Sequence, residues 1–369
     1  MTGDAIAVDV VDPPAFSGPY DDALASALAR RGVHVRLVTS GFAYGQPPRA
    51  DGYVRDERFY RYARGRAGSR LRTVTKGFAH VPDMLAYRRD AARSADVAHF
   101  QWLPFPLLDP LLRPRIPTVL TLHDPPAAAR APRRLGRALR RLDAIVVHTA
   151  AARDWLVGTA GLEPGTVHVI RHGALTALTT LAPALPPELI EPDCPVVLCF
   201  GLIRPYKGIE RLLDAWRQVT GAELWIVGRP MIDIAPLRAA APSHVRFVPR
   251  FTSDPEQAAL MRRADIVVLP YERGERFGFS GVLATALGFG TPTVTTDVAG
   301  FRELAECGAT RVVPAGDTAA LAAALQDLVD DPAARDRLAV AARAAAAGPY
   351  SWDVTAAETC ALYATIAGR

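Results

Sequence analysis

The segment at residues 200–209 reads FGLIRPYKGI and directly follows a short apolar run. A second segment, residues 280–283, reads SGVL and stands just before another helix pattern. In both places a strand pattern runs into a glycine-bearing turn and then into a helix. Such turns direct backbone N–H groups, and here also the charges of Arg204 and Lys207, towards one point. The two segments therefore predict an α/β fold with a site for a diphosphate.

The rest of the chain repeats this alternation of strands and helices. A strand at residues 5–11, a helix at 21–31 and a strand at 34–39 form one βαβ unit, which predicts a parallel sheet. Further strands are predicted at residues 97–100, 118–122, 144–148, 167–170, 196–200, 223–227, 245–247, 266–269 and 293–296. Helices are predicted at residues 209–219, 282–288, 317–329, 333–347 and 352–366.

The length of the chain predicts two domains. A chain of 369 residues, 50% of them hydrophobic, exceeds what one ordinary core accommodates. We expect a Rossmann-like domain at residues 1–173, a proline-rich linker at 174–195 and a second Rossmann-like domain at 196–348. Two doubly wound lobes of this kind leave an interdomain cleft between their carboxyl edges. Gly18 lies in the turn after the first strand, at the edge where open α/β sheets bind ligands.

The net charge of +5 is unevenly distributed. Residues 1–173 hold 25 Lys/Arg against 16 Asp/Glu, whereas residues 174–369 hold 18 against 22. Arginines recur at helical spacing from Arg130 to Arg141, opposite a stripe of leucines. This face suits a peripheral contact with an anionic membrane, and equally an ordinary solvated helix face. Nucleic acid is not an expected partner, because no recognised reading module is present.

The spacing of the cysteines and the lengths of the apolar runs indicate the cellular compartment of the protein. The cysteines show no C-x-x-C pair and no histidine at metal-ligand spacing, so we expect reduced, packed thiols and neither a zinc site nor a disulfide framework. The first residues lack a secretory signal pattern, and no run of roughly eighteen apolar residues occurs. We expect a cytoplasmic protein, with contact to the inner face of the cell membrane as the alternative.

Several short segments, in this order, match one known family. They are DVAHFQW at 96–102, TLHD at 121–124, HG at 172–173, FGLIRPYKG at 200–208, GFGTP at 288–292 and DVAGFRE at 297–303. Over nearly its whole length the chain resembles the retaining GT-B-fold glycosyltransferases of family four. The resemblance implies that the second lobe binds a nucleoside-diphosphate sugar, the first lobe binds an acceptor, and helix 352–366 crosses back onto the first lobe. It also implies a hexosyltransferase that needs no metal ion and no further cofactor.

The resemblance assigns roles to individual residues. Arg204 and Lys207 would bind the diphosphate and stabilise the charge that develops as it leaves. His123 would lie against the donor sugar as a neutral imidazole whose dipole stabilises positive charge. The ordinary alternatives are unremarkable surface charges for the cations and a strand-ending histidine that bonds backbone. The donor is further expected to contact Gly18, Ser280, Gly281 and Val282, of which Ser280 is also a good helix N-cap.

The chain departs from the commonest pattern of this family at one place. Two glutamates separated by seven residues normally flank the second loop, and they would fall at Phe277 and Thr285. The second glutamate normally holds the ribose, which Thr285 is able to hydrogen-bond more weakly. A subset of the family with a Ser-Gly-Val-Leu loop is similar to this sequence and also lacks the pair. Glu272 or Glu275 is a candidate for the lost carboxylate near the sugar.

The expected reaction is retaining transfer of a sugar to the hydroxyl of a lipid-linked glycan, a polysaccharide precursor or a small molecule. A nucleotide-sugar epimerase of the same fold is one alternative, although it would need acid–base carboxylates in the cleft. A phosphorylase-like enzyme would need a lysine for pyridoxal phosphate late in the second lobe, and no lysine follows Lys207. A catalytically silent nucleotide-sugar-binding protein is the alternative outside enzymes. The base, the sugar, the acceptor, the linkage and the oligomeric state are not encoded in these patterns.

Overall fold

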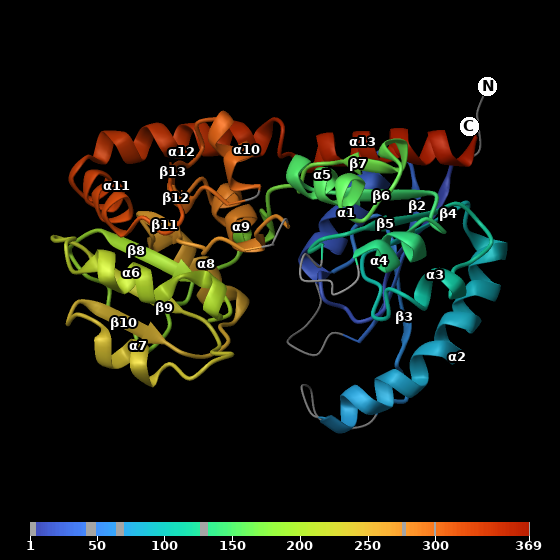
Figure 1. Cartoon of the computed structure of the whole chain (residues 1–369), viewed down its shortest axis with the longest axis horizontal. Helices are drawn as coiled ribbons and strands as arrows, with labels where there is room; N and C mark the ends of the chain where they lie inside the picture. Colours follow the sequence, from blue (N-terminus) through green and yellow to red (C-terminus); the bar gives the residue numbers. More distant parts are fainter. Residues whose placement is uncertain are drawn as a thin grey trace. The chain divides into compact units, whose positions relative to one another are not determined.

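The computed structural model describes residues 5–41, 49–63, 70–125, 132–274, 278–298 and 300–368. The chain divides into two compact units (Figure 1). Unit 1 consists of Met1–His172 together with Trp352–Arg369, and unit 2 consists of Gly173–Ser351. Each unit contains one parallel sheet with helices on it, as the GT-B expectation requires.

Unit 1 contains a seven-stranded sheet in the order β3-β2-β1-β4-β5-β6-β7. Its strands are β1 (Ala7–Asp12), β2 (His34–Ser40), β3 (Val54–Phe59), β4 (Val97–Phe100), β5 (Thr118–Thr121), β6 (Ala144–Val147) and β7 (Val167–Val169). Its helices are α1 (Gly18–Arg30), α2 (Arg70–Ser94), α3 (Asp109–Leu112), α4 (Pro132–Leu139), α5 (Ala150–Gly158) and α13 (Trp352–Ala367).

Unit 2 contains a six-stranded sheet in the order β10-β9-β8-β11-β12-β13. Its strands are β8 (Val196–Phe200), β9 (Glu223–Val227), β10 (Val245–Val248), β11 (Ile266–Leu269), β12 (Thr293–Thr296) and β13 (Arg311–Val313). Its helices are α6 (Ile209–Trp216), α7 (Ala235–Ala240), α8 (Asp254–Arg263), α9 (Gly281–Phe289), α10 (Phe301–Glu306), α11 (Thr318–Asp330) and α12 (Pro332–Ala347).

The predicted strands agree with these bounds to within two residues at each end, but two strands escaped prediction. β3 reads VRDERF and β13 reads RVV, and each lies at the edge of its sheet. An edge strand is paired on one side and carries charged side chains that a central parallel strand excludes. The apolar runs that reveal central strands, such as VVLCF of β8, are therefore missing from them.

The region predicted as a linker packs as part of unit 2. Ala174 and Leu189 are buried in one of its two hydrophobic clusters, together with Trp225 and Tyr350. The backbone N–H of Ala174 donates to the carbonyl of Tyr350 at 2.7 Å. The prolines of this segment prevent long regular structure without preventing packing.

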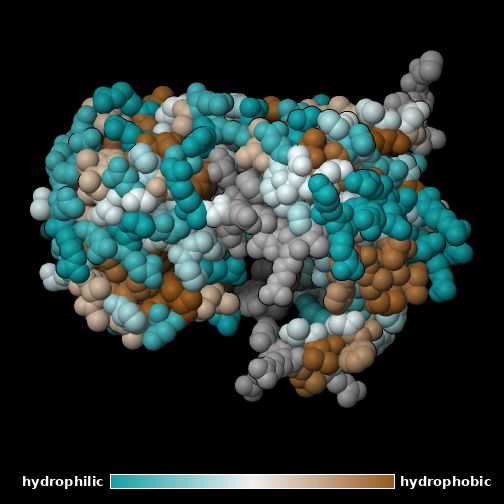
Figure 2. Space-filling model, viewed as in Figure 1, coloured by the Kyte–Doolittle hydropathy of each residue, from teal (hydrophilic) through white to brown (hydrophobic). Residues whose placement is uncertain are grey.

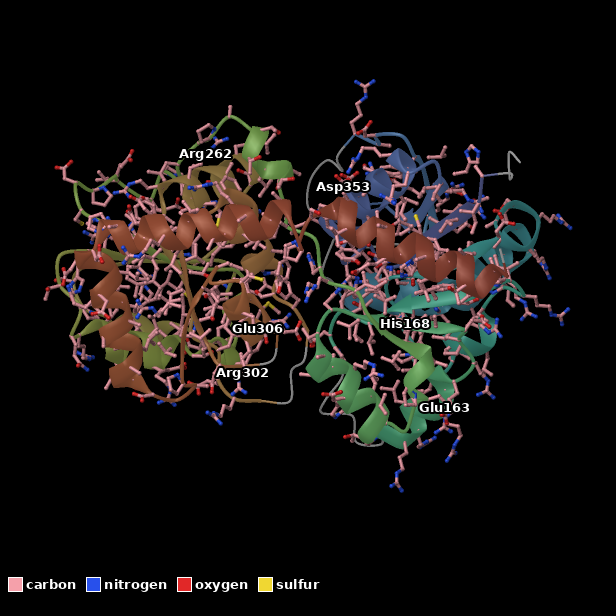
Figure 3. All side chains as sticks on the ribbon, turned by 90° about the horizontal axis from the view of Figure 1, so that it is seen from above. Glu163, His168, Arg262, Arg302, Glu306 and Asp353 are labelled. Atoms are coloured by element: carbon pink, nitrogen blue, oxygen red, sulfur yellow. The ribbon has the colours of Figure 1, made fainter. Side chains whose placement is uncertain are left out.

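The last helix, α13, belongs to unit 1 and lies against α1. Trp352 and Tyr363 are buried, and Tyr363 Oη lies 2.6 Å from Nδ1 of His99 on β4. Asp353, labelled in Figure 3, is exposed and lies 3.8 Å from Arg30 at the end of α1. None of the described helices is long and apolar enough to cross a membrane. The expectation of packed cysteines is wrong for Cys307, which is exposed.

Candidate active site

The site in unit 2 forms where the strand order of its sheet reverses. From β8 the chain proceeds outward through β9 to β10, and then continues on the other side of β8 with β11 and β12. In open α/β sheets the loops after such neighbouring strands diverge and leave a crevice for a ligand. Residues 200–209 continue from β8 and residues 280–283 follow β11, so the fold places both segments at this switch point.

Lys207 supplies a buried cation at this switch point. Lys207 is 6% exposed. Its Nζ donates to the Tyr271 hydroxyl and lies 4.4 Å from the centroid of the Tyr271 ring. Among the described residues no carboxylate pairs with it. Burial by itself lowers the pKa of Lys207, but the neighbouring Tyr271 and Tyr206 outweigh it and leave that pKa above its ordinary value. The site therefore holds a full positive charge for which the described residues supply no counter-ion.

Arg204 stands at the start of the same short turn. It is half-buried and precedes the 3-10 turn Pro205–Lys207, in which the Lys207 N–H donates to the Arg204 carbonyl at 3.0 Å. Its guanidinium has no ion-pair or hydrogen-bond partner among the described residues. An unpaired cation at this position leaves donors available for an anion.

Ser280 caps helix α9 and is linked to Lys207 through Tyr271. Its Oγ accepts from the Leu283 N–H at 3.5 Å and lies 3.1 Å from the Tyr271 hydroxyl. Tyr271 therefore joins the lysine of one loop to the cap of the other. Sequence reasoning missed Tyr271; its signal is an aromatic residue two positions beyond the apolar run of β11.

Two glycines bring the loops close together. Gly201 has φ of 104°, and a Cβ there would lie 3.1 Å from the Val282 side chain and 3.4 Å from the Lys207 Nζ. Gly208 has φ of 65°, and a Cβ there would lie 2.0 Å from the carbonyl of Pro270. Both positions need glycine because other residues rarely adopt this backbone conformation and the neighbouring atoms leave no room.

The remaining donor-site candidates of unit 2 have partners within the protein. The Thr285 hydroxyl, one turn into α9, donates to the Gly281 carbonyl at 2.9 Å. Glu272 is ion-paired with Arg211 of α6 at 2.9 Å, so its carboxylate supports the loop rather than standing free. Glu275 and Phe277 lie outside the described residues. Gly288 is closely packed against the backbone of Leu175.

The unit 1 candidates lie in a separate cluster at the carboxyl edge of its own sheet. His123 follows β5, stacks on Trp102 with ring centroids 5.5 Å apart, and meets the Tyr20 ring edge-on at 4.6 Å. Its Nδ1 lies 3.2 Å from His148 and its Nε2 lies 3.1 Å from Gln101. Burial, reinforced by His148, lowers the pKa of His123 well below its ordinary value. Sequence reasoning missed His148 and Gln101 as neighbours.

Gly18 is the first residue of α1 and borders this cluster. The preceding residue, Ser17, accepts a hydrogen bond from the Trp102 indole at 3.0 Å and donates to Asp21 at 3.0 Å. Asp12 accepts from the Ser17 N–H at 3.0 Å, and burial raises the pKa of both carboxyls. The turn at Gly18 is therefore held by an internal network.

The arginine-rich segment forms a shorter helix than the spacing predicts. The helix α4 covers Pro132–Leu139, and Arg130 lies outside the described residues. The amphipathic pattern holds: Arg133, Arg134, Arg137, Arg140 and Arg141 are exposed, whereas Leu135, Leu139 and Leu142 are buried.

A hollow of about 580 Å³ is lined by residues of α3, of the segment before β5 and of the segment between α4 and β6. Its lining includes Arg88, Arg113, Arg115 and Arg141. Hydrophobic side chains gather over the nearby α3 region on the face shown in Figure 2, where Phe105, Leu107, Leu108 and Leu111 are exposed. The described residues contain no cluster of side chains suited to a metal ion.

Comparisons with known proteins find similar sequences and similar folds. A model of Glycosyltransferase Family 4 matches residues 22–177, and a model of Glycosyl transferases group 1 matches residues 194–331. Over 171 residues the chain is 40% identical to a phosphatidyl-myo-inositol mannosyltransferase of Mycobacterium leprae (strain TN). This match covers 44% of either chain, so it spans less than half of that relative. A D-inositol 3-phosphate glycosyltransferase of Kineococcus radiotolerans is 27% identical over 98% of this chain and 91% of its own.

Solved structures share the fold over the whole chain. Sucrose-phosphate synthase from Thermosynechococcus elongatus matches with a TM-score of 0.73 and 20% identity, over 98% of this chain and 99% of the other. HepE of Anabaena, in complex with UDP-glucose, matches with a TM-score of 0.71 and 18% identity, over 97% and 100%. Two family models in sequence order, on two parallel α/β units of this fold, identify the chain: it belongs to the GT-B glycosyltransferases of the family-four type.

Proposed function

We propose that this protein transfers a hexose from a nucleoside-diphosphate sugar to an acceptor hydroxyl, with retention of the anomeric configuration. The observation that carries the proposal is the buried Lys207 ammonium, which has no carboxylate partner among the described residues. Burying an uncompensated charge costs free energy, so such a group persists where an anion completes it. A diphosphate bound against Lys207 and Arg204 supplies that anion.

The chemistry of the proposed step follows from these groups. Cleavage of the bond between sugar and diphosphate develops negative charge on the leaving phosphate. Lys207 and Arg204 would stabilise that charge, aided by N–H groups at the start of α9 next to Ser280. These cations supply the positive charge that the leaving group needs, so the proposal includes no metal ion. The departing phosphate oxygen accepts the proton of the acceptor hydroxyl, so no protein base is required.

The relatives suggest the class of donor and acceptor. HepE is described in complexes with UDP and UDP-glucose, and two of the relatives are named for inositol-containing acceptors. We propose a nucleoside-diphosphate hexose as the donor and a polyol hydroxyl as the acceptor. The excess of basic residues in the first half of the chain favours an acceptor that carries a phosphate.

A panel of UDP, GDP and ADP in thermal unfolding tests the donor site. A nucleotide at a hundred times its dissociation constant stabilises unit 2 by about 2.7 kcal/mol. Lys207→Met and Arg204→Ala are expected to abolish the shift, whereas Arg238→Ala, which removes an exposed arginine of the same unit, should preserve it. A shift that survives Lys207→Met would contradict the site.

Radiolabelled UDP- or GDP-hexose then tests the reaction, with phosphatidylinositol and inositol phosphate as acceptors. Formation of a labelled product supports transfer, and the anomeric configuration of the product tests retention. Conversion of the nucleotide sugar into an epimer without acceptor would instead identify an epimerase. Tight nucleotide binding without any turnover would identify a silent binding protein.

We also propose a peripheral contact between unit 1 and anionic membranes. Arg141, which follows the exposed arginines of α4, lines the hollow together with the exposed Leu111 of α3, and this combination of charged and apolar side chains favours an interface of charged lipid headgroups. Co-sedimentation with vesicles containing phosphatidylglycerol tests it. Arg137→Glu with Arg141→Glu should abolish salt-sensitive binding, and binding unchanged by this pair would exclude the contact.

A further inference from the structure

His148 is held in one protonation state by its own backbone contact. Its Nδ1 lies 2.9 Å from the carbonyl oxygen of Ile170, and a carbonyl oxygen only accepts hydrogen bonds. His148 must therefore carry a proton on Nδ1. Its side chain is fully enclosed, and burial lowers its pKa to about 4, so the ring is neutral at pH 7. A neutral ring with its proton on Nδ1 has an unprotonated Nε2, which only accepts.

This arrangement decides the protonation of His123. His148 Nε2 lies 3.2 Å from His123 Nδ1, and because the former accepts, the latter must donate. Burial also keeps His123 neutral, since its pKa lies well below the ordinary value. The proton of His123 therefore resides on Nδ1, and its Nε2 carries a lone pair. Each assignment follows from the preceding one, and all of them start at the Ile170 carbonyl.

The side chain of Gln101 must be oriented to match this state. Its Oε1 lies 3.1 Å from His123 Nε2, and its own Nε2 is buried without a partner among the described residues. A lone pair on His123 requires a donor, so the amide must turn its NH2 group towards the imidazole. After this rotation of the Gln101 amide, the buried group without a partner is a carbonyl oxygen and no longer an NH2 group. An unpaired carbonyl oxygen costs less free energy than an unpaired N–H donor.

The choice of tautomer sets the sign of the imidazole dipole. With the proton on Nδ1, the ring is positive towards His148 and negative at its Nε2 edge. A lone pair at that edge attracts the positive charge of an oxocarbenium-like anomeric carbon, whereas an N–H would repel it. The lone pair itself accepts from the turned Gln101 amide, so it acts on a bound sugar through its negative charge and not through a hydrogen bond.

We propose that His148 is a positioning residue that locks His123 as the Nδ1-protonated tautomer and so keeps the negative end of the imidazole dipole at Nε2. The Ile170 carbonyl anchors this relay, and Gln101 completes it at the other end. The tautomer itself is a property of unit 1 and needs no ligand. Its effect on catalysis rests on the proposed glycosyl transfer and on the family resemblance that assigns His123 to the donor sugar.

Histidine-labelled protein in ¹⁵N NMR tests the tautomer directly, because protonated and unprotonated ring nitrogens have well-separated shifts. The signals of His123 and His148 are assigned with the variants His123→Gln and His148→Gln. In the wild type at pH 7, His123 is expected to show a protonated Nδ1 and an unprotonated Nε2. A His123 protonated on Nε2 would overturn the proposal, whether or not the protein proves to be a transferase.

Two substitutions of similar size then separate positioning from packing. His148→Leu removes the acceptor, so His123 should shift its proton to Nε2 and donate to Gln101. His148→Gln retains a carbonyl oxygen near the former Nε2, so His123 should keep the wild-type tautomer. Thermal unfolding of unit 1 establishes that both variants fold. A His123 that remains Nδ1-protonated in His148→Leu would overturn the role of His148.

Kinetics completes the test once a donor substrate is identified. His148→Leu is expected to lower kcat for release of the nucleoside diphosphate at least tenfold with little change in the KM of the donor, and His148→Gln should restore most of it. A changed tautomer with unchanged kcat would overturn the catalytic part of the proposal. A wild-type protein without transferase activity would contradict the proposed function but would leave the NMR result standing.

Discussion

The carboxyl edges of the two sheets are built on opposite electrostatic principles. In unit 1 the polar side chains at this edge are largely satisfied by one another: His123, His148 and Gln101 form a neutral chain that ends on a backbone carbonyl. In unit 2 the edge carries Lys207 and Arg204, whose charges lack a carboxylate partner among the described residues. An edge that is internally satisfied is complete without a ligand, whereas an edge with uncompensated charge requires one.

The two units also differ in their titratable residues. Seven of the eight histidines lie in unit 1, and His244 lies in unit 2. Of the 43 basic residues two are lysines, Lys76 and Lys207, one in each unit. Each has its Nζ over a tyrosine ring, at 4.9 Å from the Tyr60 centroid and 4.4 Å from the Tyr271 centroid. Each lysine ammonium group of the chain therefore lies against a tyrosine ring, and that of Lys207 is the more deeply buried.

Acidification should have the largest effect and should destabilise unit 1 more than unit 2, because the buried neutral histidines lie in unit 1. Burial lowers the pKa of His99 to about 3 and that of His148 to about 4. Unfolding restores ordinary values near 6.5, so the unfolded chain binds more protons and stability falls as pH drops below that value. Each histidine removes about 1.4 kcal/mol per pH unit, or roughly 4 kcal/mol for the two at pH 5, and the raised pKa values of Asp12 and Asp21 offset part of this loss.

Hydrogen exchange measured between pH 7 and pH 5 resolves the two units. Protection is expected to fall in β4 and β6 of unit 1 while β8 and β11 of unit 2 change little. Equal loss of protection in both units would contradict the assignment of neutral histidines to unit 1.

Lys207→Met should separate stability from binding in unit 2. The substitution removes a buried charge without leaving a cavity, so unit 2 is expected to gain on the order of 1 kcal/mol in stability. The same change should lower the rate of transfer by roughly 10²–10³, as for loss of one donor to a developing anion. Thermal unfolding and single-turnover assays check the two effects. A destabilised variant would show that the lysine serves the fold rather than a ligand.

Two glycines of α9 allow a test of where the diphosphate binds, because one has open space beside it and the other is closely packed. A Cβ at Gly281 would meet no atom within 4 Å, whereas a Cβ at Gly288 would lie 2.2 Å from the Leu175 carbonyl. Gly281→Ala is expected to fold normally and to weaken nucleotide binding, because its methyl group occupies the space at the helix start. Gly288→Ala should instead destabilise unit 2 by about 1–3 kcal/mol and leave affinity unchanged. Calorimetry and thermal unfolding compare them, and the reverse pattern would contradict the placement of the diphosphate.

Thr285→Val should give the smallest effect. The two side chains have the same shape, and the Thr285 hydroxyl bonds within its own helix, so stability should change little. If this hydroxyl contacts the ribose, affinity for UDP should fall by about 1 kcal/mol. The matching control is 2′-deoxy-UDP. Equal losses in the variant for both nucleotides would show that Thr285 does not contact that hydroxyl.

The central strands of both sheets and the loops after β8 and β11 were predictable from sequence. Apolar runs such as IVVL of β11 leave few alternatives to a buried parallel strand. The edge strand β3 was not predictable, because its charged residues resemble a loop. Tyr271 and His148 were not predicted as site residues, since each acts through a neighbour from a distant part of the chain.

The sequence by itself determined the family, the parallel α/β architecture and the residues Arg204 and Lys207, because these depend on local patterns of apolar runs, glycines and charges. Only the tertiary structure decided that Lys207 is buried without a carboxylate partner among the described residues, that Glu272 is bound to Arg211, and that the Ile170 carbonyl orders the protons of two histidines. Burial, ion pairing and tautomer depend on which side chains meet in space, and residues far apart in the chain supply them.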